Sequence, residues 1–144
     1  MSTPHPQSPA PETAYGPYSP ITRAGELFFV SGQVGIDPAN KTAPLTIEQQ
    51  TAQAMANLSQ VLETAGLTLD NVVKTTVFLT DMSDFSAMNT EYLRHFDVPR
   101  PARSTVGVAE LPRLGGDVPL FVEIEAIAST TAAPNLNSQD LPNA

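Results

Sequence analysis

The sequence predicts an α+β fold in which one mixed β-sheet carries two helices, both packed on the same face. Runs rich in β-branched residues alternate with two amphipathic segments, in the order strand, strand, helix, strand, helix, strand, strand. The crossovers through helices imply parallel or mixed pairing of the strands. Two helices are too few to cover both faces of such a sheet. We therefore expect the second face to meet water or another subunit.

The chain is expected to form one domain between two flexible ends. Residues 1–14 are rich in proline and contain no apolar run, and residues 130–144 are polar, so both segments are predicted to be flexible tails. The domain is therefore expected to span residues 15–129. It begins with two predicted strands, at 19–24 and 26–33, which flank a turn at Ala24 and Gly25.

The first helix has sequence signals at both of its ends. Thr46 and Gln49 have the spacing of a capping box, and Glu48 favours the positive end of the helix dipole. Gly66 is placed to end the helix as the C′ residue. Between these positions, apolar residues recur on one helical face: Ile47, Ala54, Leu58, Val61, Leu62 and Ala65.

The second half of the domain is expected to contribute three strands and the second helix. Residues 72–81 are rich in β-branched residues and are predicted to form a central strand. Ser83 is expected to cap a helix that runs to about Phe96, and residues 103–110 and 120–128 are predicted to be strands. The inner face of this helix is expected to consist of Phe85, Met88, Tyr92 and Phe96.

Composition excludes several classes of function. The chain has 144 residues, of which 41% are hydrophobic, and it contains no cysteine, so disulfides, thiolate metal sites and a cysteine nucleophile are ruled out. Its net charge is −8 and its seven Lys and Arg residues do not cluster, which argues against nucleic acid as a partner. The sequence shows neither a signal peptide nor a membrane span, and we expect a cytoplasmic protein. The two scattered histidines predict no metal site.

Arg103 is the first candidate for chemistry. In the segment ARSTVGVAE, alternation puts Arg103 on one strand face with Thr105, Gly107 and Ala109, whose small side chains leave room for a ligand. A guanidinium group binds a carboxylate through two parallel, charge-assisted hydrogen bonds. From spacing alone, however, an exposed arginine in a structural ion pair is the more common interpretation.

Two glutamates are the second candidates. Glu123 and Glu125 share one strand face, and the apolar residues between and beyond them share the other, which is expected to pack on the helices. A carboxylate with a raised pKa in a partly dry pocket can move protons at neutral pH. Taken alone, the same pattern is more often a solvated face of a sheet.

Four further residues are weaker candidates when taken alone. Tyr18 lies in YGPYSP, Ser31 and Gly32 close the strand FFVSGQ, and Asn89 lies on the second helix beside Met88. Glycine permits close approach of a ligand to the backbone. Packing, an end-of-strand hydroxyl and a helix surface amide are the ordinary interpretations of Tyr18, Ser31 and Asn89.

In combination, these segments make the chain resemble the reactive intermediate deaminase family, RidA/YjgF. The resemblance covers about Tyr15 to Ala128 and rests on several blocks in the same order: GPYSP (16–20), FVSGQ (29–33), NVVKTTVFLTDMSDFSAMN (71–89), PARS (101–104) and VEIEAIA (122–128). It implies a chorismate-mutase-like fold of the bacillus type. It also implies a homotrimer with sites in the clefts between subunits.

The resemblance implies an activity and a role for each candidate residue. The activity is hydrolysis of enamines and imines such as 2-aminoacrylate to 2-oxo acids and ammonia, with no cofactor. Arg103 matches the arginine that binds the substrate carboxylate, and Glu123 matches the glutamate that positions and activates water. Tyr18 is expected to assist catalysis. The positions that match substrate-binding residues of the pocket are Ser31, Gly32, Asn89 and Thr105.

Some features depart from the family, and other functions stay open. Thr105 stands where many members carry cysteine. The connection before Arg103 is several residues shorter than in archetypal members, and the hairpin after it, residues 111–121, is several residues longer. These changes leave the substrate open. The alternatives are a regulator that binds small carboxylates without turnover, a chaperone-like member, and an endoribonuclease, which the acidic net charge disfavours.

Overall fold

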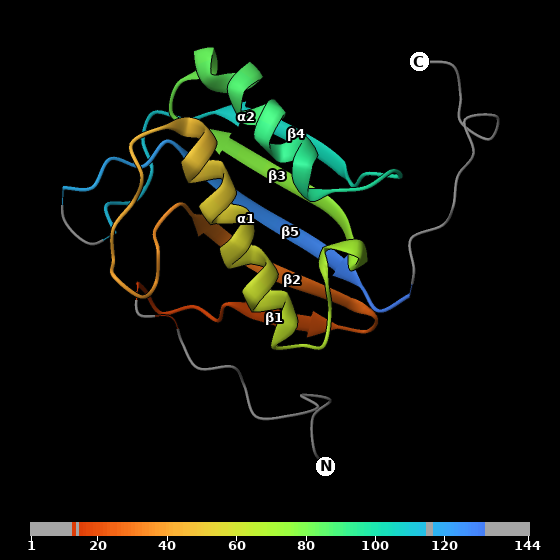
Figure 1. Cartoon of the computed structure of the whole chain (residues 1–144). Coiled ribbons are helices and arrows are strands. Elements are labelled where there is room, and N and C mark those ends of the chain that lie inside the picture. Colours follow the sequence, from red (N-terminus) through yellow and green to blue (C-terminus); the bar gives the residue numbers. More distant parts are fainter. Residues whose placement is uncertain (1–12, 14, 115–116, 132–144) are drawn as a thin grey trace.

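The computed structural model describes residues 13, 15–114 and 117–131, and it has the predicted architecture: a five-stranded mixed sheet with both helices on one face (Figure 1). The predicted order of elements is confirmed. Their bounds are β1 Ile21–Ala24, β2 Leu27–Val34, α1 Ile47–Glu63, β3 Val72–Leu79, α2 Phe85–Tyr92, β4 Ala102–Gly107 and β5 Val122–Ser129. The predicted tails, 1–14 and 130–144, lie almost wholly outside the described residues.

The strand order across the sheet is β1-β2-β5-β3-β4. Among the strands of the described residues, only β3 and β4 pair in parallel, and α2 makes the crossover between them. The other pairs are antiparallel. The strand at residues 72–81 was predicted to be central, and β3 is indeed an interior strand. The middle position belongs to β5, however, because the last strand inserts between β2 and β3.

Both end signals of α1 are used. Thr46 Oγ1 accepts a hydrogen bond from the Gln49 backbone N–H at 3.2 Å, although among the described residues the Gln49 side chain makes no reciprocal bond. At the other end Gly66 has a φ of +75°. The N–H groups of Gly66 and Leu67 donate to the carbonyls of Glu63 and Leu62, each at 3.0 Å, which is the Schellman pattern. The predicted C′ position is confirmed.

The predicted start of the second helix was wrong. Ser83 does not cap α2, which begins at Phe85 without a side-chain cap. Asp81 caps the preceding 3-10 turn: its Oδ1 accepts hydrogen bonds from the Ser83 N–H at 2.9 Å and the Ser83 hydroxyl at 2.7 Å. These bonds lower the pKa of Asp81. A carboxylate is the stronger acceptor, so the serine hydroxyl serves as a donor to it. A short 3-10 turn, Met82–Asp84, therefore precedes α2, and another, Leu93–His95, follows it.

The two faces of the sheet differ as predicted. Along β5 the side chains that face the helices are buried: Val122, Ile124, Ala126 and Ala128. On the opposite face, large apolar side chains stay exposed, with Leu27, Phe29 and Val106 at 39%, 40% and 42%. In the described chain no helix covers this second face.

Candidate functional site

Arg103 lies on the helix-covered face of the sheet, at the edge strand β4. It pairs with Thr75 of β3, and its guanidinium carbon lies 4.7 Å from the ring centroid of Tyr92 and 5.7 Å from that of Phe85. Among the described residues, the guanidinium group has no hydrogen bond and no ion pair. Aromatic rings hold the arginine in place, and its donors stay available to a ligand.

The room beside Arg103 is not where the strand pattern predicted it. β4 ends at Gly107, so Ala109 is not on the strand, and a Cβ on Gly107 would lie 2.9 Å from Cγ of Met82. The free space lies instead between β4 and α2, in a hollow of about 410 Å³. Arg103 lines it with Asn89, Thr90, Tyr92, Leu93, Arg100 and Pro101.

Tyr92 is held in place by burial and by a hydrogen bond to Thr75 of β3. It is 4% exposed, and its hydroxyl forms a hydrogen bond of 2.7 Å with the hydroxyl of Thr75, which is fully buried. Burial raises the pKa of Tyr92. Phe85 was predicted to lie on the inner face of the helix, but it is 37% exposed and lies beside Arg103, because α2 begins at this residue.

Two predicted pocket residues carry buried polar atoms without partners. Oδ1 of Asn89 and Oγ1 of Thr105 are both inaccessible and have no hydrogen bond among the described residues. A buried polar atom without a partner costs about 1–3 kcal/mol, so each one requires an explanation, for which an absent ligand or partner is one option. The third such atom in the described chain, Thr51 Oγ1, lies on α1 and lines neither the hollow beside Arg103 nor that beside Tyr18. Asn89 lines the same hollow as Arg103.

Glu123 lies on the opposite face of the sheet, beside Phe78 of β3 and Val34 of β2. Burial, and secondarily the charge of Glu125, raise the pKa of Glu123. Gly32 makes room for it: a Cβ on Gly32 would collide with the Glu123 carboxylate and lie 2.6 Å from its carboxyl carbon. The prediction that Glu123 and Glu125 face away from the helices is confirmed.

Ser31 and Tyr18 lie near Gly32. The Ser31 hydroxyl donates to the Ser19 carbonyl at 2.7 Å, and the Ser31 N–H donates to the Pro20 carbonyl at 3.0 Å. Ser31 therefore ties the segment before β1 to β2. Tyr18 is 40% exposed and lines a hollow of about 270 Å³ with Gly32.

The candidate residues thus form two groups in one chain. Glu123, Gly32 and Tyr18 lie on and beside β2 and β5, whereas Arg103 lies on β4 with Asn89 nearby on α2. Glu123 on β5 is two inter-strand steps from β4, roughly 10 Å, and Gly32 on β2 is three steps from it, roughly 14 Å. In addition, Arg103 and Glu123 point to opposite faces of the sheet. One chain alone does not bring Arg103, the arginine predicted to bind a carboxylate, to Glu123, the predicted base.

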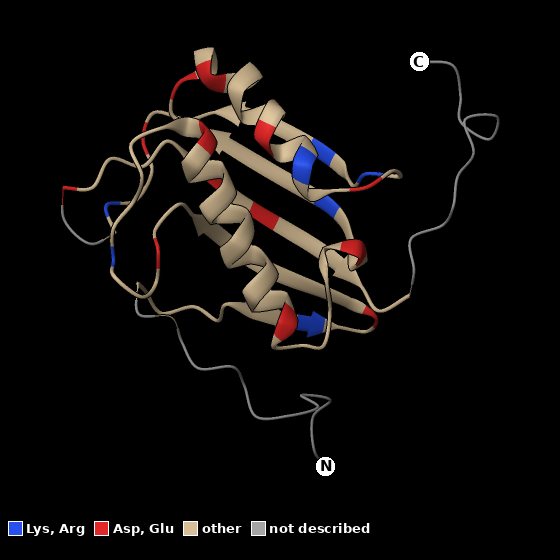
Figure 2. Ribbon diagram, in the orientation of Figure 1, with Lys and Arg blue, Asp and Glu red and all other residues tan. Residues whose placement is uncertain are grey.

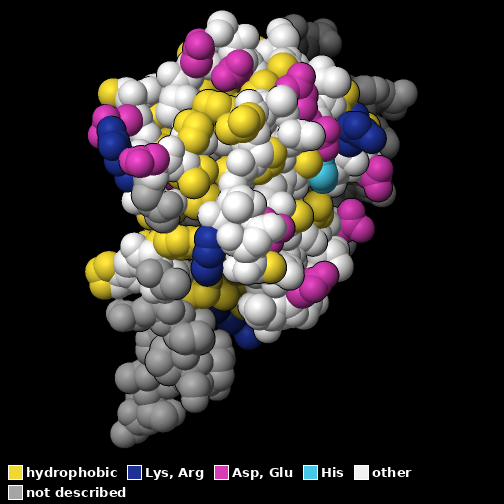
Figure 3. Space-filling view, turned by 60° about the vertical axis from the view of Figure 1, so that its left-hand side comes forward, with side chains coloured by type: hydrophobic (Ala, Val, Ile, Leu, Met, Phe, Trp, Pro, Cys, Tyr) yellow, Lys and Arg dark blue, Asp and Glu magenta, His cyan; other side chains and the backbone are white. Residues whose placement is uncertain are grey.

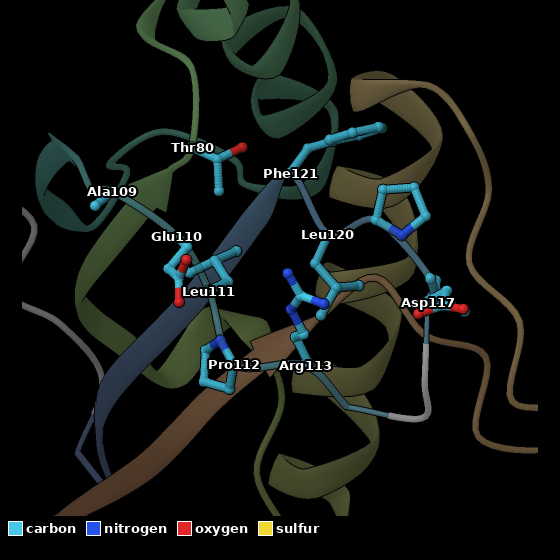
Figure 4. A pocket seen from close by; sticks show the side chains of 11 residues that line it. Thr80, Ala109, Glu110, Leu111, Pro112, Arg113, Asp117, Leu120 and Phe121 are labelled. Carbon is cyan, nitrogen blue, oxygen red and sulfur yellow. The ribbon is translucent and has the colours of Figure 1, made fainter.

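A hollow of about 430 Å³ lies elsewhere, along the segment between β4 and β5 (Figure 4). This segment was predicted to be a hairpin, but β3 lies between β4 and β5 in the sheet, so the segment is a crossover connection. Its lining mixes charges of both signs, Glu110, Arg113 and Asp117, and contains none of the predicted site residues. None of the unpartnered buried polar atoms found in the described chain belongs to this lining. Figure 3 turns this side of the molecule forward and shows hydrophobic side chains gathered among acidic ones. The predicted site residues thus all lie outside this hollow.

Comparison with known proteins agrees with the resemblance seen in the sequence. A family model described as Endoribonuclease L-PSP matches residues 7–130. A 2-iminobutanoate/2-iminopropanoate deaminase of Mus musculus is 43% identical over 116 residues, which are 80% of this chain and 82% of the mouse protein. The chain belongs to the RidA/YjgF family. A RutC family protein of Pyrococcus horikoshii is 45% identical over 116 residues, covering 78% of this chain and 86% of the relative.

Solved structures of the RidA/YjgF family have the same fold. The crystal structure of E. coli TdcF with bound serine matches with a TM-score of 0.74 at 34% identity, covering 85% of this chain and 94% of that chain. The mixed α+β sheet with two helices on one face is therefore the fold of the family. In the described part of this chain, no helix is long and apolar enough to cross a membrane.

Of the seven residues that line the arginine hollow, sequence reasoning singled out Asn89 and Arg103 as site residues, and two of the five that it missed bear directly on ligand binding. Tyr92 was predicted only as a core residue, although its ring also supports Arg103. Arg100 was not singled out, and it lines the hollow three positions before Arg103. The only available signal was the spacing of two arginines around Pro101 in RPAR.

Proposed function

We propose that the protein hydrolyses enamine and imine acids, such as 2-aminoacrylate and 2-imino acids, to 2-oxo acids and ammonia. The observation that carries this proposal is Arg103: a guanidinium held by two aromatic rings, in a hollow, without an anionic partner in the described chain. Every substrate of this class has a carboxylate next to the imine carbon. Arg103 would bind that carboxylate through paired charge-assisted hydrogen bonds and so orient the imine.

Glu123 fits the role of the group that moves protons. Its raised pKa brings the carboxyl closer to neutrality, where a general base is most effective. Ionised Glu123 would take a proton from water as the water oxygen bonds to the imine carbon. The same proton would then pass to nitrogen. Glu123 would then take the hydroxyl proton of the carbinolamine and pass it to the same nitrogen, so that the C–N bond breaks as the C=O bond forms, ammonia leaves and Glu123 is again ionised. Tyr18 would assist from the neighbouring hollow, and no cofactor is needed.

A site shared between copies would unite the two groups. Arg103 lies at the free edge of the sheet, since β4 is the last strand, and Glu123 lies on the face that carries exposed Phe29 and Val106. If this face packs on another copy, the Arg103 group of one subunit can meet the Glu123 group of its neighbour. We propose that the protein is a homotrimer with three such clefts. Ser31, Gly32, Asn89 and Thr105 would then line each cleft.

Trapping of imino acids tests the proposal. An amino-acid oxidase generates 2-imino acids in the presence of semicarbazide, and hydrolysis by the protein suppresses formation of the semicarbazone. We expect suppression by the wild type and a loss of roughly 100-fold or more in Arg103→Ala, because two charge-assisted hydrogen bonds disappear. An unchanged trapping curve with the wild type over several imino acids would refute the hydrolase.

A regulator that binds carboxylates without turnover is the alternative. The E. coli relative TdcF has been crystallised with bound serine, itself a small carboxylate. A regulator needs Arg103 but not Glu123. Ligand binding that survives in Glu123→Gln together with lost turnover supports the hydrolase, whereas full function in Glu123→Gln supports the regulator.

The name of the family model also raises cleavage of RNA. A net charge of −8 and only seven basic residues oppose it, because phosphate contacts supply most of the affinity for RNA. We therefore place this activity below the other two.

A further inference from the structure

The hollow that contains Arg103 contains a second arginine. Arg100 lines the same space of about 410 Å³, which is within the size range of small-molecule sites. Pro99 and Pro101 flank Arg100 and restrict its backbone, so the start of its side chain is held in place. Arg100 is exposed, whereas Arg103 is partly buried between β4 and α2.

The charge of this hollow is unusual for the molecule. Its lining contains Arg100 and Arg103 and no carboxylate, in a chain with a net charge of −8. Among the described residues, neither guanidinium group has a hydrogen bond or an ion pair. Figure 2 shows basic residues gathered beside the end of α2 and the start of β4, and acidic residues also lie on α2 and on the connection between α2 and β4. Two unpaired cations that share one hollow favour a ligand with two negative charges.

We propose that the preferred substrates are 2-imino acids with a second carboxylate at the far end, and that Arg100 selects them. This inference rests on the proposed hydrolase. Arg103 binds the carboxylate next to the imine carbon, and Arg100 binds the distal carboxylate at the mouth of the hollow. The reaction is the same hydrolysis: water adds to the imine carbon, ammonia leaves and a 2-oxo dicarboxylate forms. The distal carboxylate makes and breaks no bond.

The test compares two substrates in four proteins. D-Aspartate oxidase acting on D-glutamate supplies the dicarboxylic imine, and D-amino-acid oxidase acting on D-2-aminobutyrate supplies the monocarboxylic imine, with catalase removing peroxide. The readout is the ratio of the two kcat/KM values in the wild type, Arg100→Gln, Arg100→Lys and Arg94→Gln. Arg94 is the matched control because its side chain is 74% exposed and lies outside the hollow.

We expect the wild type to favour the dicarboxylic imine and Arg100→Gln to lower the ratio by about tenfold, as for loss of one charged contact. Arg100→Lys retains part of the preference, and Arg94→Gln leaves the ratio unchanged. The preference should also shrink with added salt, because Arg100 is exposed. An Arg100→Gln ratio equal to that of the wild type would overturn the inference. So would dissociation of the assembly in this variant, since Arg100 would then serve the interface.

Measurements of ligand binding without turnover distinguish a failure of this inference from a failure of the proposed hydrolase. Calorimetry with 2-oxoglutarate and 2-oxobutanoate measures the two ligand classes without turnover. If the wild type hydrolyses neither imine but binds 2-oxoglutarate more tightly, and Arg100→Gln loses that preference, the hydrolase fails and the assignment of the ligand class stands. If the wild type shows no preference in either assay, the assignment fails as well.

Discussion

Glu123 owes its raised pKa first to burial and then to Glu125, which lies two positions along β5 on the same face. As the proposed base, Glu123 must be ionised to accept a proton, so activity should fall as the pH drops through this pKa. Glu125→Gln removes the nearby negative charge and lowers the pKa of Glu123. We therefore expect the acidic limb of the profile of kcat/KM against pH to move to lower pH. A limb that stays in place in Glu125→Gln would contradict Glu123 as the base.

The raised pKa of Glu123 should also make stability depend on pH, but in the opposite direction: activity falls at low pH, whereas the free energy of unfolding falls at higher pH. The folded state holds the proton of Glu123 above the pH at which the unfolded chain releases it. The free energy of unfolding therefore falls as the pH rises from the ordinary glutamate pKa to the raised one. Glu123→Gln removes this contribution, and urea unfolding across that range should show a flatter dependence on pH. A slope equal to that of the wild type would argue against the raised pKa.

Tyr92 combines two roles that substitutions can separate. Tyr92→Phe keeps the ring beside Arg103 but leaves the buried Thr75 hydroxyl without a partner, which should cost about 1–3 kcal/mol in urea unfolding. Adding Thr75→Val should recover much of this loss, because both polar groups are then gone. Tyr92→Leu also removes the ring that supports Arg103. We therefore expect a strong rise in KM in Tyr92→Leu and not in Tyr92→Phe. Equal KM values in Tyr92→Phe and Tyr92→Leu would contradict the supporting role of the ring.

At the level of elements, both ends of α1 depend on single residues. Thr46→Ala removes the hydrogen bond to the Gln49 N–H and should cost about 1 kcal/mol. Gly66→Ala places a side chain at a φ of +75° and should cost about 1–2 kcal/mol. Chemical unfolding of each variant measures these changes, and because the two ends of the helix lie far apart the costs should add in the double variant. Strongly non-additive costs would contradict independent caps.

Local patterns predicted most elements, because caps, glycines and alternation act within a few residues. Alternation along β5 correctly separated Val122 and Ile124 from Glu123. The start of α2 was missed, since Asp81 and Ser83 are both good caps in sequence, but Asp81 caps a 3-10 turn and α2 begins only at Phe85, without a side-chain cap. Arg103 and Glu123 lie on opposite faces of the sheet because of the way the strands pair. The contact between the Tyr92 ring and Arg103 likewise depends on this pairing. Neither follows from spacing within one segment.

At the level of the whole molecule, the uncovered face of the sheet is the expected contact between copies. Phe29→Glu or Val106→Glu would place a charge on this face without touching the core. We expect either variant to dissociate and to lose turnover while its circular dichroism stays native. Leu45→Glu, at an apolar position that is 75% exposed in the loop before α1, is the matched control for charge. Light scattering that shows a monomer for the wild type would undo the shared site.

Gly32 and Glu123 occupy one space, and this has a consequence for how the sequence can vary. Any Cβ at position 32 displaces the glutamate carboxylate, so the tolerance of one position depends on the residue at the other. Gly32→Ala should be harmful where Glu123 is present and milder beside Glu123→Ala, whose shorter side chain frees the space. The pair is therefore expected to show strong epistasis: substitutions of Gly32 should be tolerated in variants that lack the glutamate at position 123 and not in variants that keep it.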